Sequence, residues 1–71
     1  MEIKTVDARG LSCPQPIVET KKVLDKISGG RVEVLVDTVT SRENVLRFGR
    51  NAGWQGSFEE SEGFFKVILE K

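Results

Sequence analysis

The chain has 71 residues, and its 11 basic and 11 acidic side chains give a formal net charge of zero. This balance argues against a protein held mainly by attraction to nucleic acid or to an anionic membrane. One cysteine and no histidine exclude an internal disulfide, a multi-thiolate metal site and a Cys–His catalytic pair within the chain.

The length predicts one domain, residues 1–71, with a thin core and no cofactor or metal site. The N-terminal residues have the pattern of a strand and do not resemble a signal peptide. No apolar run is long enough to cross a bilayer. We therefore expect a protein of the reducing cytoplasm that does not associate with membranes.

The first half of the chain predicts a strand, a helix and a second strand. Residues 2–6 are rich in Ile, Thr and Val, and residues 7–10 form a turn in which Gly10 adopts an unusual backbone angle. Apolar residues at helical spacing predict a helix over residues 14–27, ended by glycines. Residues 31–37 alternate valines and predict an inner strand.

A second helix is predicted over residues 41–52. Thr40 and Glu43 have the spacing of a capping box at its start, and a glycine follows its end. Val45, Phe48 and Ala52 form its apolar stripe, with Leu46 at the edge and Gly49 placed to allow close approach to the sheet. The arginines of this helix lie on the other side and are expected to be an ordinary solvated face: Arg42, Arg47 and Arg50.

The last part of the chain predicts a β-hairpin. Strands are expected over residues 54–59 and 64–70, with a turn over residues 60–63. The aromatic residues of this region are expected to pack in the core or at the sheet edge. Two helices are too few to cover both faces of a four-stranded sheet, so we predict an α+β fold: a two-layer βαβαββ sandwich with both helices on one face.

Cys13 is the candidate reactive residue. Pro14 suits the first position of the first helix, which makes Cys13 its N-cap and places the thiol near the positive end of the helix dipole. However, Pro14 and Pro16 lack the N–H groups that would otherwise point at the sulfur. The motif therefore favours a fixed, accessible thiol over a strongly lowered pKa. The sequence does not fix where the charge of Arg9 lies relative to this thiol.

The residues around Cys13 resemble the signature of the TusA/SirA-like sulfur-carrier family. The similar stretch reads Asp-Ala-Arg-Gly-Leu-Ser-Cys-Pro-Gln-Pro over residues 7–16 and continues into Lys21-Lys22. Residues 36–48 look most like the YedF-like branch, which is linked to selenium metabolism and often forms the N-terminal part of longer proteins. The resemblance implies a βαβαββ sandwich with a mixed sheet.

The resemblance also implies roles for the motif residues. Cys13 would carry sulfur as a persulfide and relay it between partner enzymes, while Pro14 and Pro16 match structural prolines. The residues of the lead-in would shape the loop: Asp7, Arg9 and Gly10. The implied partners are a sulfur donor, such as a cysteine desulfurase or a rhodanese-like enzyme, and an acceptor sulfurtransferase, for example in tRNA thiolation.

Two alternatives remain open on the sequence. One is a regulatory or RNA-binding interaction module, against which the zero net charge and the absence of tyrosine speak; we do not expect direct nucleic-acid binding. The other is a carrier of selenium on the same cysteine, which the sequence cannot separate from a sulfur carrier. A thiol without a base in its own chain depends on partners for activation, so whether the chain counts as an enzyme stays open.

Overall fold

The computed structural model describes residues 3–11, 15–27 and 29–71 of the chain. Its elements are β1 (Ile3–Asp7), α1 (Gln15–Leu24), β2 (Arg31–Val36), α2 (Val39–Asn51), β3 (Gln55–Ser61) and β4 (Phe64–Glu70). This order confirms the predicted βαβαββ sequence of elements. None of the helices described is both long enough and apolar enough to cross a membrane.

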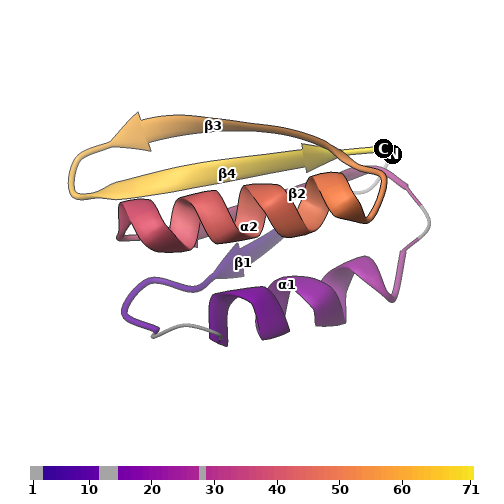
Figure 1. The fold of residues 1–71 in the computed structure, drawn as a ribbon, viewed down its shortest axis with the longest axis horizontal. Coiled ribbons are helices and arrows are strands. Elements are labelled where there is room, and N and C mark those ends of the chain that lie inside the picture. Colours follow the sequence, from indigo (N-terminus) through magenta and orange to yellow (C-terminus); the bar gives the residue numbers. More distant parts are fainter. Residues whose placement is uncertain (1–2, 12–14, 28) are drawn as a thin grey trace.

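The four strands form one mixed sheet in the order β1-β2-β4-β3. β1 and β2 are parallel, whereas β4 is antiparallel to both β2 and β3. α1 packs on β1 and β2, α2 packs mainly on β3 and β4, and the helices contact each other, so they cover the same face (Figure 1). The predicted two-layer α+β sandwich is confirmed.

The core lies between this face and the helices. β2 contributes its alternate valines, and β4 contributes Val67 and Leu69, which the register pairs with them across the strands. The buried side chains of the helices close the core from the other side: Pro16, Thr20, Leu24, Val45 and Leu46. Apolar residues that repeat every two positions in the strands thus pack against apolar residues at helical spacing in α1 and α2, and together they form one apolar layer.

The opposite face of the sheet is covered by ion pairs instead of a second helix layer. Arg31 Nε lies 3.0 Å from a Glu33 carboxylate oxygen, and Lys66 Nζ lies 3.9 Å from the other oxygen. These side chains come from adjacent strands on the face that also carries Ile68, which is buried. The aliphatic stems of the charged residues thus shield the apolar groups of this face.

α1 ends at Leu24 and not at Ile27 as predicted. The Lys26 N–H donates to the carbonyl of Val23 at 3.1 Å, three residues back, so the last turn is tighter than an α-helix. The helix buries Thr20 and Leu24 against the core. On its exposed side, Lys21 Nζ lies 3.5 Å from the Asp25 carboxylate, four residues on.

The start of α2 differs from the predicted capping box. The N-cap is Thr38, whose backbone is extended and whose side chain accepts a hydrogen bond from the Ser41 N–H at 3.0 Å. The helix therefore begins two residues before the predicted start at residue 41, and Glu43 hydrogen-bonds with Arg42 at 2.8 Å instead of reaching back to Thr40. Two threonines two residues apart both fit a cap by sequence, and Thr38 is the one that caps α2.

The end of α2 is a Schellman motif. Gly53 has a φ of +92°, its N–H donates to Arg50, and the Trp54 N–H donates to Gly49. The predicted glycine stop is confirmed, but Trp54 belongs to this cap and is not part of the strand. Its burial explains why: the residue after the cap packs back onto the core.

The predicted apolar stripe of α2 is partly wrong. Val45 is fully buried and Phe48 is half-buried, but Ala52 is exposed and Leu46 is a core residue. Starting the helix at Val39 does not change the side-chain spacing, so the cause is the way α2 sits on the sheet. The buried side of α2 contains Val45 and Gly49 and extends towards Leu46, not towards Ala52.

The hairpin is longer than predicted. β3 continues to Ser61, which pairs with Phe64, so only Glu62 and Gly63 form the turn. Gly63 has a φ of +78°, a value that only glycine adopts readily. Pairing the two strands up to a two-residue turn satisfies more backbone groups than the expected four-residue turn over residues 60–63.

Arg42 is not part of a solvated face, which corrects the prediction for this arginine. Its guanidinium lies 4.1 Å from the ring centroid of Phe58 and 4.9 Å from that of Phe65. Its Nε is buried and has no hydrogen-bond partner among the residues that the structure describes. Arg42 thus joins the first turn of α2 to the β3–β4 hairpin by stacking on aromatic rings.

Candidate functional site

The predicted site residues that the structure describes, Asp7, Arg9, Gly10 and Pro16, lie where β1 and β2 end and both helices begin. Strands β1 and β2 are parallel and each leads into a helix, so both helix N-termini lie at the same end of the sheet (Figure 1). Neither helix has an acidic residue in its first turn. The positive ends of two helix dipoles are therefore presented at this end without a carboxylate within either first turn.

The turn after β1 is formed by residues 8–11. The Ala8 N–H donates to the carbonyl of Leu35 at 2.8 Å, which continues the pairing of β1 with β2, and the Leu11 N–H donates back to the Ala8 carbonyl. Gly10 has a φ of +80°, and a Cβ added to it would have no atom of the described residues within 4 Å. The predicted backbone angle of Gly10 is confirmed, and the turn requires this angle rather than the small size of glycine.

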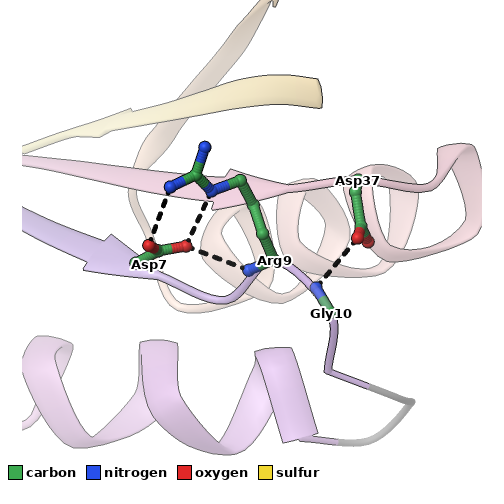
Figure 2. A network of polar contacts seen from close by, with 4 residues as sticks. All are labelled: Asp7, Arg9, Gly10 and Asp37. Carbon is green, nitrogen blue, oxygen red and sulfur yellow. Dashed lines mark hydrogen bonds and ion pairs between the residues drawn. The ribbon is translucent and has the colours of Figure 1, made fainter. Parts of the chain in front are cut away.

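Arg9 is held by Asp7 across this turn. Its Nε and one terminal nitrogen donate to the two carboxylate oxygens of Asp7 at 2.9 and 3.0 Å, and its backbone N–H also donates to Asp7, at 3.2 Å (Figure 2). The Arg9 guanidinium also lies 5.1 Å from the ring centroid of Phe64. Three hydrogen bonds therefore join Asp7 and Arg9 within the turn, and the charge of Arg9 is largely balanced by its neighbour.

The paired charges change the acidity of both groups. The side-chain and backbone hydrogen bonds from Arg9 lower the pKa of the Asp7 carboxyl below its ordinary value. In return, the hydrogen bond to Asp7 and its charge raise the pKa of Arg9, with a smaller contribution from Asp37. Both shifts favour the charged forms of Asp7 and Arg9, which lie 2.9 Å apart as an ion pair.

Asp37 is a site residue that the sequence reasoning missed. Its carboxylate accepts a hydrogen bond from the Gly10 N–H at 2.8 Å, although the two residues are 27 positions apart in the chain. Figure 2 shows Asp37 on the far side of Gly10 from the Asp7–Arg9 pair. An aspartate that ends a strand and precedes a helix cap is the only local signal, and such a signal also fits an ordinary turn.

Pro16 lies in the first turn of α1 and is fully buried. Its carbonyl accepts a hydrogen bond from the Thr20 hydroxyl at 2.8 Å, and Thr20 is itself buried. Pro16 therefore anchors the start of α1 in the core as well as fixing its backbone angle, and its packing role was not predicted. Cys13 and Pro14 lie outside the described residues, so the predicted N-cap and first helical position stay predictions.

The structure thus fixes both flanks of the segment that contains Cys13. Before it, the turn of residues 8–11 is tied to Asp7 and Asp37; after it, α1 begins at Gln15 and is anchored by Pro16. Only residues 12–14 separate the two flanks. The described residues on either side of this segment lie at the end of the sheet at which both helices begin.

Comparison with known proteins gives consistent matches over nearly the whole chain. The family described as sulfurtransferase TusA matches residues 4–71. A provisionally named sulfur carrier protein of Methanocaldococcus jannaschii is 35% identical over 71 residues, covering 97% of this chain and 95% of that protein. A similarly named protein of Bacillus subtilis is 32% identical over 59 residues, covering 83% of this chain and 79% of that protein.

A solved structure has the same fold. The crystal structure of a SirA-like protein from Desulfitobacterium hafniense has a TM-score of 0.90 to this chain, with 36% identity, and the match covers 94% of this chain and 95% of that chain. The family match begins before Asp7 and continues past Pro16, so it contains every predicted site residue.

Proposed function

The chain belongs to the TusA family of sulfurtransferases, and on this premise we propose that it is a small sulfur carrier with Cys13 as its persulfide site. The observation that carries the proposal is the position of the single cysteine of the chain. It stands in the Cys-Pro-x-Pro motif between a turn tied by long-range hydrogen bonds and the first turn of α1, in which Pro16 is buried. A scaffold held on both flanks suits the presentation of one thiol to partner proteins.

The proposed transfer needs no oxidant or reductant. The Cys13 thiolate attacks the terminal sulfur of a persulfide on a donor protein, and a new S–S bond forms on Cys13. The S–S bond of the donor breaks, and its electron pair leaves on the donor cysteine as a thiolate. The loaded carrier then passes its terminal sulfur to an acceptor by the same exchange, and Cys13 returns to a thiolate.

Partners would supply the activation that the chain itself lacks. The sequence contains no histidine and no second cysteine, so it offers no in-chain imidazole base and no resolving thiol. The donor class is therefore a persulfide-forming enzyme, such as a cysteine desulfurase or a rhodanese-like enzyme, and the acceptor class is a sulfurtransferase. The pathway served by the acceptor, whether tRNA thiolation or selenium metabolism, is set by that partner.

The test is persulfide loading followed by intact-protein mass spectrometry. The protein is incubated with a cysteine desulfurase, cysteine and, in parallel, a carrier known to be loaded by that enzyme. We expect the mass of one added sulfur atom on the wild type, its removal by a reducing agent, and none on Cys13→Ser. Replacing cysteine by selenocysteine distinguishes a selenium carrier.

Two results would speak against the proposal. One is an unloaded wild type under conditions, and with several donors, that load the reference carrier. The other is equal loading of wild type and Cys13→Ser, which would place the sulfur elsewhere. Thermal unfolding of both proteins serves as the control, because a Cys→Ser change replaces a single atom and is expected to leave stability nearly unchanged.

A further inference from the structure

We infer that Asp37 is a positioning residue for sulfur transfer, which it serves by fixing the turn that precedes Cys13. The inference rests on the proposed function of Cys13 and adds to it a residue from a distant part of the chain. Asp37 follows β2, and its carboxylate accepts the Gly10 N–H at 2.8 Å. It therefore ties the β1–α1 connection to the β2–α2 connection.

The hydrogen bond falls on a residue whose backbone needs outside support. Gly10 has a φ of +80° and no side chain, so its neighbours do not restrict it as they would any other residue. The bonds between Asp7 and Arg9 lie within three residues and fix only the first part of the turn. The bond from the Ala8 N–H to Leu35 holds the start of the turn to β2, and Asp37 supplies the long-range bond at Gly10, further along the turn.

Asp37 itself stands on a rigid base. Val36, just before it, is fully buried in the core, and Thr38, just after it, caps α2 by accepting the Ser41 N–H. The backbone of Asp37 is therefore held in place between a core residue and a helix cap. The bond to its carboxylate accordingly restricts the position of the Gly10 N–H.

A second contact holds the same turn from the hairpin side. The Arg9 guanidinium lies 5.1 Å from the centroid of the Phe64 ring, at the start of β4. The turn is thus fixed between two elements that are distant in sequence, and Asp37 provides the hydrogen-bonded part. This arrangement lowers the number of conformations that the loop must lose when a donor protein binds.

Loss of the bond between Asp37 and Gly10 should affect KM and kcat differently. If the loop adopts the competent shape only part of the time, the apparent affinity for the partner falls by that fraction, while the chemistry of the bound complex is unchanged. Weakening the tie should therefore raise the KM of the donor enzyme for this carrier and leave kcat nearly constant. An exposed hydrogen bond of typical net strength corresponds to a change of about three- to tenfold.

Two conservative variants separate the hydrogen bond from the charge. Asp37→Asn removes the charge but keeps an acceptor oxygen at the same reach. Asp37→Glu keeps the charge but moves the carboxylate outward by one methylene. Asp25→Glu is the matched control, because Asp25 is an exposed acid paired with Lys21 near the far end of α1.

The experiment measures donor-dependent loading as a function of carrier concentration, together with hydrogen exchange of the Gly10 amide by NMR. We expect Asp37→Asn and Asp25→Glu to match the wild type. We expect Asp37→Glu to raise KM about three- to tenfold with little change in kcat, and to speed Gly10 amide exchange. Thermal unfolding confirms that each variant is folded at the assay temperature.

The inference is overturned if Asp37→Glu loads with an unchanged KM, or if Asp37→Asn has the raised KM instead, since the charge would then be what matters. Failure of the proposed function has a different signature. The wild type would remain unloaded by every donor, while Gly10 amide exchange would still report whether the tie to Asp37 forms.

Discussion

Replacing Gly49 by alanine tests the close packing of α2 on β4. Gly49 is buried in the interior of α2, where alanine would ordinarily be the better helix former by about 1 kcal/mol. At this position, however, an ideal Cβ would overlap Leu69 Cδ2 and would lie 2.9 Å from Leu69 Cδ1 and 3.2 Å from Leu69 Cγ. Leu69 is fully buried and cannot move aside into solvent.

The overlap should outweigh the gain in helix propensity. Forcing an extra methyl group into a packed core costs about 1–3 kcal/mol, and contact with three atoms of one buried side chain places Gly49 in the upper part of that range. Subtracting the propensity gain leaves a net loss of about 2 kcal/mol in the free energy of unfolding. For a domain of this size that loss lowers Tm by about 8–16 °C.

Urea unfolding followed by fluorescence measures this loss. The chain has a single tryptophan, Trp54, which is buried directly after α2 and so reports on this interface. Arg47→Ala on the exposed side of α2 is the control and should change stability by no more than about 0.5 kcal/mol. In the Leu69→Ala background the alanine at 49 should become favourable, because it fills part of the cavity. A stabilised Gly49→Ala single variant would refute the reasoning.

Three further predictions follow from the corrected local geometry. Asp7→Asn should destabilise the fold at neutral pH, and this effect should vanish in acid. Because Arg9 lowers the folded-state pKa of Asp7, the ion pair contributes to the free energy of unfolding above the unfolded pKa of about 3.9. This contribution is lost as the pH falls through the folded-state pKa. Thr38→Ala should cost about 0.5–2 kcal/mol in urea unfolding, whereas Thr40→Ala should cost much less. Arg42→Gln should cost about 0.5–2 kcal/mol by loss of its aromatic contacts, with little dependence on salt.

Each of these predictions has an outcome that contradicts it. A destabilisation by Asp7→Asn that persists unchanged below the folded pKa would show that the ion pair is not its cause. Equal costs for the two threonine variants would place the start of α2 elsewhere. For Arg42, the comparison is Arg47→Gln, which removes the same charge from an exposed position; equal effects would mean that stacking on the rings contributes nothing.

Local patterns in the sequence were sufficient for the order and type of the elements. The alternating valines of β2 and the apolar spacing of both helices reflect periods that the backbone itself imposes. The turns at Gly10, Gly53 and Gly63 could also be predicted, because a left-handed backbone angle strongly favours glycine. The family resemblance around Cys13 could also be recognised from the sequence, because the residues that carry it are contiguous.

Element ends were less predictable because several residues compete for the same local role. Thr38 and Thr40 both fit a helix cap, and the end of α1 depends on a single tightened turn at Lys26. The predicted exposure of Arg42 failed for a related reason. Helical spacing places it on the polar side of α2, yet the hairpin, which is distant in sequence, folds its aromatic rings against that side.

The sequence by itself determined the element order, the two-layer architecture and the choice of Cys13 as the candidate site, since all three rest on short-range patterns and residue counts. Only the tertiary structure decided what surrounds that site. Asp37 and Gly10 become neighbours because β1 and β2 pair in parallel and end together, and Arg9 meets Phe64 because β4 begins at the same end. These contacts join residues far apart in the chain, and strand pairing, not local propensity, fixes them.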